Sequence, residues 1–423
     1  MNEKKGLVPR LRFPEFREAG EWPLASLKQL ATRRTERNRD GEVVRVLTNS
    51  AEHGVVDQRD YFEKDIATQG NLENYFIVDE GDFVYNPRIS TFAPVGPISQ
   101  NTVAKGVMSP LYTVFRFNNP DNLFYKHYFK SSGWHLYMRQ VGSTGARHDR
   151  MAIGNEDFMA MPLPKPPPEE QKKIADCISS LDALITAQAD KLDALKTLKK
   201  GLMQQLFPRE GETVPRLRFP EFREAGEWEN ITLGKIAKFI SGGTPSKDVA
   251  DYWKGSIPWI SASSMHDIKI EKSDFSITDS AVKAGARIAE KGTLLLLVRG
   301  SMLHKRIPMG ISAIDVAFNQ DVKALELKGN ITAEYLIYFL SARESELLGQ
   351  VTSTGIGAGK LDTLNLKEFP VAIPVAKEQQ KIANCFSSLD ALIAAQADKL
   401  DTLKTHKRGL MQQLFPNPEA VAA

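Results

Sequence analysis

Two stretches of the chain, residues 174–206 and 382–414, place mostly apolar side chains, with one glutamine and one lysine in each stretch, at alternating spacings of four and three. This heptad pattern is typical of a helix that packs against another helix along one continuous seam. A proline follows each stretch, and proline ends a helix more readily than it continues one. The pattern therefore predicts two long helices, over 166–208 and 374–416, that form a coiled coil.

The connections between these helices favour an antiparallel pair. The first helix leads into the region 229–373, and that region leads directly into the second helix. Both helices therefore attach to the same region, and the seam then pairs Ile174 with Leu414. An alternative stays open, in which each amphipathic helix packs independently on its own domain.

The regions between the helices carry shorter patterns of both kinds. The runs "TLLLLV" and "YTVFRF" are typical of strands, while "AEYLIYFLSARESELL" and "LFYKHYFKSSGWHLYMR" are typical of helices. We expect an α+β fold in which two mixed α/β domains, 23–165 and 229–373, are separated by the two long antiparallel helices.

Much of the chain is an internal duplication. The segment Val8–Trp22 recurs without a change at Val214–Trp228, and Glu169–Pro208 recurs at Lys377–Pro416 with 32 of 40 positions identical. The chain thus predicts a pseudo-two-fold molecule. Its expected order is a repeat segment, domain, helix, linker with the repeat segment, domain, helix and tail, at 1–22, 23–165, 166–208, 209–228, 229–373, 374–416 and 417–423.

The two domains share a sparser skeleton. The stretch Gly81–Ser90 matches Gly292–Ser301 in its glycine, arginine and serine, and a Ser-Thr-Gly motif recurs at 143–145 and 353–355. Because the remaining sequence differs, we interpret the domains as one scaffold that carries two different surfaces.

Composition is that of an ordinary globular protein, with 42% hydrophobic and 25% charged residues. No run of about 18 apolar residues predicts a membrane span, and the N-terminus has no apolar signal segment. Two cysteines are too few for a disulfide framework. We therefore expect the protein in the cytoplasm, with no membrane partner.

Charge and motifs argue for binding without catalysis. The net charge is +3, and residues 23–168 and 229–376 each hold 17 basic against 16 acidic side chains, so nucleic acid would be held by local clusters. The stretch "STGIGAGKL" departs from a phosphate-binding loop at two positions, and no nucleophile elbow or histidine pair at metal spacing is present. We expect no catalytic residue, metal or cofactor in this chain.

Candidate nucleic-acid contacts are clustered basic and hydroxyl side chains. Arginine both binds phosphate and recognises guanine in the major groove, so the stretch "RRTERNRD" is a candidate DNA contact. The alternative without a function is that this stretch forms a solvated helix face. Gly-Ser-Thr loops let the backbone approach a phosphate but are also common turns. The selected residues are Arg33, Arg34, Arg37, Arg88, Ser143, Thr144, Arg147 and Arg150 in the first domain, and Ser241, Thr244, Ser246, Lys247, Arg299, Ser301, Lys305, Arg306, Ser353, Thr354 and Lys360 in the second.

The whole pattern resembles the specificity subunit of type I restriction–modification systems. The resemblance is carried by the tandem plan, the Glu-Gln-x-x-Ile junctions at 170–174 and 378–382, and the "GLMQQLFP" helix ends. The second domain adds "ISGGTPSK", "LLLVRGS" and "TSTGIGAGKL". The first domain departs from it, with "NPRIS" and "STGARHDRM" in the corresponding places.

This resemblance implies a non-catalytic subunit that binds double-stranded DNA and docks two methyltransferase (modification) subunits, joined by motor and nuclease (restriction) subunits. The complex is expected to use S-adenosylmethionine, ATP and magnesium, with no cofactor in this chain. Each target-recognition domain is expected to read one half of a bipartite, asymmetric site while the helices set the gap. The second hypothesis is a protein-interaction scaffold with two binding modules on a coiled coil and no nucleic acid.

Overall fold

The computed structural model describes residues 7–61, 69–144, 149–355 and 357–416. The chain divides into two compact units, which we call unit 1 (1–189 and 398–423) and unit 2 (190–397). Each unit contains one predicted domain together with a part of both long helices. The predicted helices are therefore shared between the units and do not form a separate domain.

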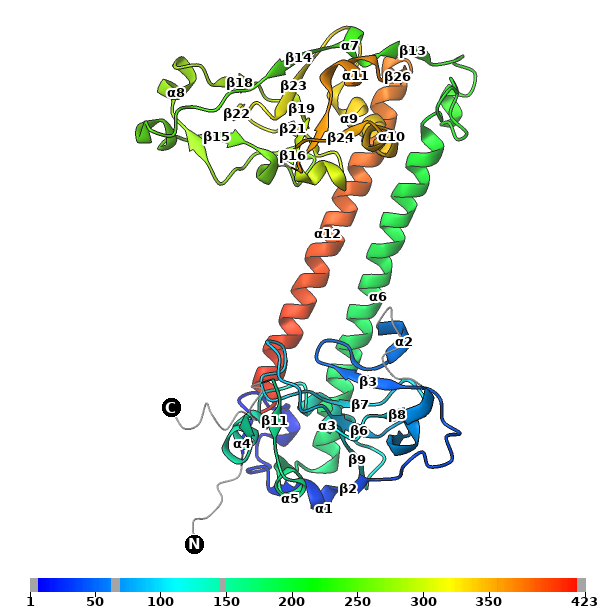
Figure 1. Cartoon of the computed structure of the whole chain (residues 1–423), viewed down its shortest axis with the longest axis vertical. Coiled ribbons are helices and arrows are strands. Elements are labelled where there is room, and N and C mark those ends of the chain that lie inside the picture. The colour runs from blue at the N-terminus through cyan, green and yellow to red at the C-terminus, as the bar shows by residue number, and fades with distance from the viewer. Residues whose placement is uncertain (1–6, 62–68, 145–148, 356, 417–423) are drawn as a thin grey trace. The chain divides into compact units, whose positions relative to one another are not determined.

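Unit 1 is built on a four-stranded antiparallel sheet of order β2-β9-β6-β7, with the two-stranded pairs β1-β12, β3-β4, β5-β8 and β10-β11 around it (Figure 1). Its strands are β1 (Leu24–Ser26), β2 (Ala31–Arg34), β3 (Leu47–Ser50), β4 (Gly54–Asp57), β5 (Phe76–Val78), β6 (Phe83–Tyr85), β7 (Ile98–Gln100), β8 (Gly106–Met108), β9 (Thr113–Phe117), β10 (Ser143–Thr144), β11 (Met151–Ala152) and β12 (Pro162–Pro164). Its short helices are η1 (Pro14–Phe16), α1 (Leu27–Leu30), α2 (Gln58–Tyr61), η2 (Gln69–Asn74), α3 (Leu123–Tyr128), α4 (His135–Val141) and α5 (Asn155–Met159).

Unit 2 contains a five-stranded sheet of order β14-β23-β19-β21-β16 and a four-stranded sheet of order β17-β15-β22-β18 (Figure 1). Its strands are β13 (Glu229–Thr232), β14 (Ala237–Ser241), β15 (Ile257–Ile260), β16 (Lys269–Ile270), β17 (Ser276–Ile277), β18 (Arg287–Ala289), β19 (Leu294–Leu297), β20 (Arg299–Gly300), β21 (Met309–Ser312), β22 (Val316–Phe318), β23 (Val322–Leu327), β24 (Val351–Ser353), β25 (Gly359–Leu361) and β26 (Pro370–Ile373). Its short helices are η3 (Pro220–Phe222), α7 (Leu233–Ile236), η4 (Ala250–Trp253), η5 (Ala262–Ser264), α8 (Asp279–Lys283), η6 (Ser301–His304), α9 (Ala333–Ala342), α10 (Glu344–Gly349) and α11 (Thr363–Glu368).

Both predicted strands exist, and their burial explains their patterns. All four leucines of β19 are buried, because this strand lies in the middle of the five-stranded sheet between β23 and β21. A strand covered on both faces has no polar alternation. In β9, Phe115 and Phe117 face an aromatic core, where Phe83 lies 5.6 and 5.0 Å from their ring centroids.

The predicted domain helices are each interrupted, which corrects the expectation of one continuous helix per pattern. In "LFYKHYFKSSGWHLYMR" the break falls between α3 and α4, where the Ser131 hydroxyl donates to the Tyr128 carbonyl at 2.6 Å. A serine that bonds its local backbone competes with helix continuation. In "AEYLIYFLSARESELL" the break falls at Arg343, whose guanidinium forms an ion pair with Glu346.

The long helices are α6 (Pro168–Leu206) and α12 (Ala376–Leu414), as the heptad pattern predicted. In unit 1 the start of α6 packs against the end of α12, and Ile174 and Leu414 lie in one buried cluster. In unit 2 the end of α6 packs against the start of α12. This arrangement within each unit confirms the antiparallel pairing.

Each unit carries an equivalent ion pair between the helices. Lys407 pairs with Asp182 in unit 1, and Lys199 pairs with Asp390 at 2.5 Å in unit 2. The four residues occupy equivalent positions of the repeat. Lysines at seam positions are therefore accommodated by a carboxylate on the facing helix, which fixes the same register in both units.

The repeat segments are clamped to the starts of the long helices by buried ion pairs. Arg12 donates twice to Glu170, at 2.7 and 2.7 Å, and Arg218 donates twice to Glu378, at 2.8 and 2.7 Å. All four side chains are at most 7% exposed. Paired bonds of this geometry hold a planar guanidinium in one orientation, so the identical segments adopt the same position in both units.

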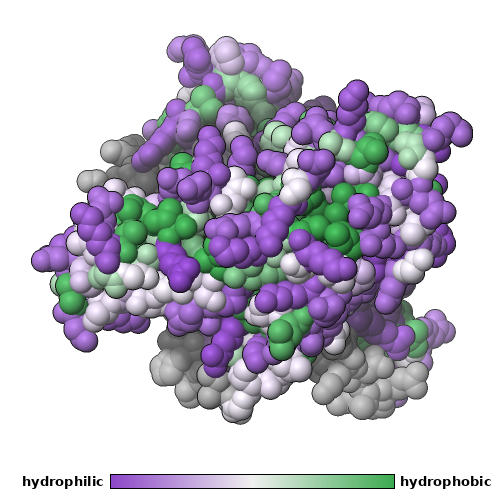
Figure 2. Space-filling view, turned by 90° about the horizontal axis from the view of Figure 1, so that it is seen from above, coloured by the Kyte–Doolittle hydropathy of each residue, from purple (hydrophilic) through white to green (hydrophobic). Residues whose placement is uncertain are grey.

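One face of the protein is largely polar. The face in Figure 2 is mostly hydrophilic, with small apolar patches separated by polar side chains. Within the described residues, no helix combines the length and hydropathy that crossing a bilayer requires.

Candidate nucleic-acid interface

In unit 1, two cations lie directly opposite each other on neighbouring backbone segments. Arg88 follows β6 and forms an isolated antiparallel bridge with Arg150, which precedes β11. Backbone hydrogen bonds of 2.8 and 2.9 Å flank this pair instead of joining it. In this type of antiparallel pair the side chains lie on one face and are closest together. Both cations therefore point to the same side.

Unit 2 repeats this arrangement with different residues. Arg299 in β20 pairs with Lys360 in β25, and the backbone bond from Leu361 to Val298, at 2.9 Å, again flanks the pair. The strand β24 completes a three-stranded sheet of order β20-β25-β24. The shared positions of Arg88 and Arg299 thus place an arginine against a second cation in both units.

The Ser-Thr-Gly motifs lie beside these pairs. In unit 1, Ser143 and Thr144 form β10, whose partner β11 follows Arg150. In unit 2, Ser353 pairs with Gly359 next to Lys360. The expected loop is therefore a β-hairpin in both units. Arg147 lies outside the described residues.

These cation pairs are electrostatically unfavourable in the free protein. Like charges directly opposite in an antiparallel pair destabilise it. Nearby carboxylates compensate only in part, since Asp149 lies 3.9 Å from Arg150 and Asp362 lies 3.1 Å from Lys360. Bound phosphates would supply the negative charge that each pair lacks, so the geometry suits a polyanionic ligand.

Unit 1 also gathers predicted arginines around a concavity of about 740 Å³. Arg33, Arg37 and Arg150 line it together with Phe76 and Tyr112, and none of the described lining residues is acidic. Arg33 Nε is buried and has no hydrogen-bond partner in the described part of the chain. A buried donor without a partner is costly. We interpret this surface as extending the Arg88 site.

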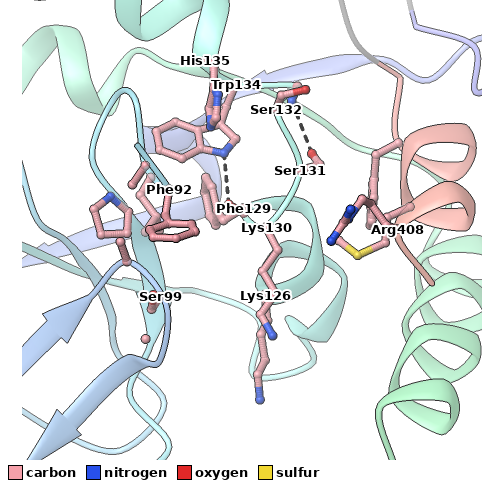
Figure 3. Close-up of a pocket in the computed structure, with 18 of the residues that line it drawn as sticks. Phe92, Ser99, Lys126, Phe129, Lys130, Ser131, Ser132, Trp134, His135 and Arg408 are labelled. Carbon is pink, nitrogen blue, oxygen red and sulfur yellow. Dashed lines mark hydrogen bonds between the residues drawn. The ribbon is translucent and has the colours of Figure 1, made fainter. Parts of the chain in front are cut away.

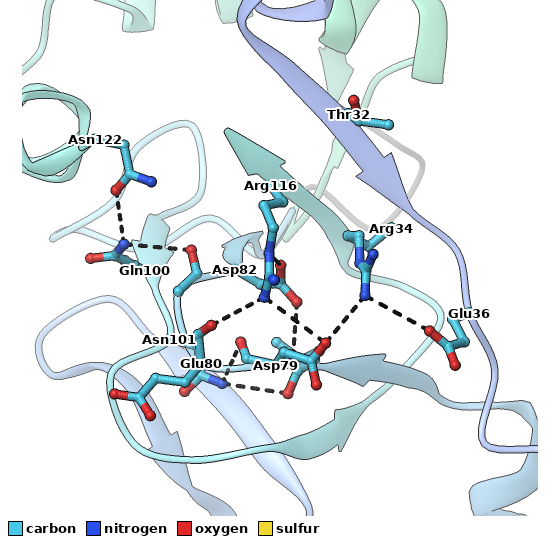
Figure 4. Close-up of polar contacts among 12 residues, drawn as sticks. Thr32, Arg34, Glu36, Asp79, Glu80, Asp82, Gln100, Asn101, Arg116 and Asn122 are labelled. Atoms are coloured by element: carbon cyan, nitrogen blue, oxygen red, sulfur yellow. Dashed lines mark hydrogen bonds and ion pairs between the residues drawn. The ribbon is translucent and has the colours of Figure 1, made fainter. Parts of the chain in front are cut away.

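Arg34 behaves differently from its neighbour. Its guanidinium lies 3.1 Å from Asp79, within a network that also joins Arg116 to Asp82 at 2.6 Å (Figure 4). Burial raises the pKa of Asp82, while hydrogen bonds from the Asp79 backbone and Arg116 oppose that rise. The network ties β2 and β9 to the turn between β5 and β6, so Arg34 is engaged structurally.

The remaining candidates of unit 2 are dispersed. Thr244 donates to Gln320 at 2.7 Å, and Arg306 donates to the Met265 carbonyl at 3.0 Å, so both side chains have partners within the fold. Thr354 Oγ1 is buried with no partner among the described residues. Ser241 accepts from Lys323. The others, all of them exposed, are Ser246, Lys247, Ser301 and Lys305.

Sequence reasoning overlooked one group of cations in unit 1. Lys126, Lys130, Lys404 and Arg408 line a second concavity. The first two stand in an apolar stretch typical of a core helix, and the others lie more than 270 positions later. The sequence signal for this group is the i, i+4 spacing within each pair of cations. That spacing indicates that the two members share a helix face, but it does not indicate that the two pairs meet.

Comparisons with known proteins assign the family. A model of the type I restriction modification DNA specificity domain matches residues 225–405. The type I restriction enzyme EcoR124I/EcoR124II specificity subunit of Escherichia coli is 30% identical over 284 residues, or 65% of this chain and 68% of that protein. The MjaIX specificity subunit of Methanocaldococcus jannaschii is 34% identical over 199 residues, or 45% and 43%.

Solved structures share the fold. The S subunit of a type I restriction–modification system from M. genitalium aligns with a TM-score of 0.57 at 15% identity, covering 97% of this chain and 100% of that one. A chain from a structure on complex assembly and conformational transition of the type I R-M system aligns with a TM-score of 0.58 at 17% identity, covering 93% and 97%. The likeness to the E. coli relative, over two thirds of its length, shows that the chain belongs to the type I restriction enzyme specificity subunits.

Proposed function

We propose that the chain recognises a specific sequence in duplex DNA, with each unit reading one half of a bipartite, asymmetric site. The observation that carries this proposal is the pair of opposed cations beside a hairpin in both units, Arg88 with Arg150 and Arg299 with Lys360. Opposed cations favour a polyanion, and their recurrence on unlike domains favours two contacts with one duplex.

A β-hairpin is a form of backbone that such reading can use. A two-stranded β-ribbon fits the major groove, where each base pair presents a distinct pattern of donors and acceptors. Contacts to phosphates fix the register of the protein, whereas side chains on base edges distinguish sequences. In this proposal the cation pairs position each hairpin, and the side chains that differ between the hairpins read different bases.

The duplicated frame supports the further parts of the proposal. Two identical partners bind most simply to two equivalent surfaces, and the clamped repeat segments and helix halves supply such surfaces. We assign them to two modification subunits, with restriction subunits joining the complex. The partners would supply catalysis with S-adenosylmethionine, ATP and magnesium in the cytoplasm, while this non-catalytic chain sets the gap between half-sites through its paired helices.

Two matched double variants test the proposal, Arg88→Ala/Arg150→Ala and Arg299→Ala/Lys360→Ala. In complex with the modification subunit, each variant should lower the slope of log affinity against log salt by up to about 1.8, because each lost phosphate contact contributes about 0.9. Each should also relax discrimination in one half-site only.

The readout is a duplex titration at several salt concentrations, with substitutions placed in either half of the methylated target. Wild-type affinity and slope in both variants would remove the hairpins from the interface. Absence of any DNA binding by the wild-type complex would favour the scaffold hypothesis instead.

A further inference from the structure

Unit 1 contains a second basic concavity, of about 990 Å³, which the hairpin site does not include. Its walls come from α3 and the turn after it, the loop between β6 and β7, the turn between β3 and β4, and the end of α12 (Figure 3). Its lining brings Lys126 and Lys130 from the first domain together with Lys404 and Arg408 from the last helix.

These cations are available to a ligand. Lys130, Lys404 and Arg408 are exposed, and Lys126 is half-buried. None of the four has an ion pair to a carboxylate within the described residues. Lys407 also lines the concavity but is paired with Asp182. Among the described lining residues Glu52 is the one acid, so positive charge is in excess.

The cations also affect one another. The surrounding protein lowers the pKa of the Lys130 ammonium, first through desolvation, and repulsion from Lys407 and Lys126 adds to the decrease while Asp182 opposes it. Converging ammonium groups in a partly desolvated position favour an anion that neutralises them.

An internal comparison shows that this surface is specific to unit 1. Equivalent aromatic contacts align the two domains. In unit 1, Phe124 and Tyr128 have ring centroids 5.4 and 5.8 Å from that of Phe415. In unit 2, Tyr335 and Phe339 have ring centroids 5.8 and 5.7 Å from that of Phe207. In this alignment Lys126 corresponds to the buried Ile337, and Lys130 corresponds to Ser341. The helix cations recur as Lys196 and Lys200. The equivalent surface of unit 2 thus lacks the two cations that Lys126 and Lys130 supply in unit 1.

We infer that this concavity binds the sugar–phosphate backbone of duplex DNA without reading sequence, as an anchor that only unit 1 provides. The inference rests on the proposed function and extends it to a surface that includes the helical frame. A partner that docks twice would need equivalent surfaces in both units, whereas one duplex bound once can use an unequal one.

The position of one loop supports DNA as the occupant. The connection between β6 and β7 carries Arg88 of the hairpin site, and its later part, from Phe92 to Pro97, lines the second concavity. Different parts of a single loop within unit 1 therefore contribute to both surfaces. A duplex held by the opposed cations passes next to the second concavity, where its phosphates meet four further cations.

The test uses three double variants of the chain in complex with its modification subunit. Lys126→Gln/Lys130→Gln and Lys404→Gln/Arg408→Gln remove the anchor from either wall. Lys196→Gln/Lys200→Gln removes the equivalent helix cations of unit 2 and is the matched control. Circular dichroism and assembly with the modification subunit verify that each variant folds and docks.

Each anchor variant should lower the slope of log affinity against log salt by about 1.8, since two phosphate contacts are lost. The ratio of affinities for target and scrambled duplexes should stay unchanged, and the control should keep the wild-type slope. Lysine-to-arginine replacement at 126 and 130 should restore the slope.

Other outcomes overturn the inference. Wild-type slopes in both anchor variants would exclude a DNA contact here, and an equal loss in the control would deny its restriction to unit 1. Loss of assembly with intact DNA binding would make this an acidic-protein surface instead. A wild-type complex with no sequence preference would contradict the proposed function itself. Failure of the proposed function is thereby distinguished from failure of the anchor.

Discussion

The buried clamps allow a stability prediction with a matched control in the same chain. In unit 1, Glu170 is fully buried and accepts two hydrogen bonds from Arg12, at 2.7 and 2.7 Å, and one from Trp22 Nε1, at 3.0 Å. Glu170→Ala leaves the guanidinium of Arg12 buried without its counter-charge. Breaking a buried ion pair in this way costs about 3–5 kcal/mol.

The second clamp lacks one of these bonds. Glu378 accepts two hydrogen bonds from Arg218, but Trp228 Nε1 is buried with no partner among the described residues. Glu378→Ala therefore removes an equivalent ion pair without orphaning a further donor. Since an unpaired buried donor costs about 1–3 kcal/mol, Glu170→Ala should destabilise its unit by about that much more than Glu378→Ala.

Urea denaturation followed by circular dichroism and tryptophan fluorescence measures both losses, with each unit fitted as its own transition. Replacing the pair together, as Arg12→Met/Glu170→Leu, should recover the part of the loss that comes from the unpaired charge, whereas Trp22 Nε1 still lacks its acceptor. A Glu170→Ala protein within about 1 kcal/mol of wild type, or no more destabilised than Glu378→Ala, would refute this reasoning.

Two further predictions concern unit 1. His127 is buried, and its Nε2 lies 2.9 Å from Ser179 Oγ. Burial lowers the pKa of this imidazole to about 4. Between about pH 6.5 and pH 4, the unfolded chain therefore binds a proton at His127 that the folded chain does not bind. The free energy of unfolding should therefore fall by about 3 kcal/mol between pH 6.5 and 4. Urea midpoints measured over that range should show this fall in the wild type and a smaller one in His127→Gln. An identical pH dependence of the two proteins would contradict the prediction. Gly96→Ala should displace the loop that carries Arg88, because a Cβ at position 96 would lie 2.2 Å from the Asn86 carbonyl oxygen. Gly81→Ala is the control, since Gly81 also has a positive φ but no atom lies close to its Cβ position. Duplex titration should show weaker binding by Gly96→Ala than by Gly81→Ala, and equal binding would contradict the prediction.

Local patterns predicted the helical frame because its information is local. The seam of α6 and α12 repeats every few residues, and the antiparallel orientation follows from which region each helix joins. The pairing of Lys199 with Asp390 was not predicted, since a lysine in a seam carries no sign of the carboxylate that will face it.

The candidate site was predictable where the two domains could be compared. The recurrence of Arg88 as Arg299 drew attention to one position in each domain, but the residues that face them, Arg150 and Lys360, lie more than 60 residues away in the sequence. The same kind of distant pairing joins Arg34 to Asp79, a contact within the fold that the local arginine cluster did not indicate.

The proposed DNA contacts differ in what they contribute, because some would provide affinity for any sequence and others would provide discrimination between sequences. A backbone contact adds nearly the same free energy to every sequence, so it raises affinity without changing discrimination. If unit 1 alone holds the extra anchor at Lys126 and Lys130, mismatches still cost the same in either half-site, because the anchor cancels in the ratio of target to non-target binding. The steeper salt dependence, however, would belong to unit 1. Transferring the anchor by Ile337→Lys would fail, because Ile337 is buried in the core of unit 2 and a lysine there would lose its hydration without gaining a partner.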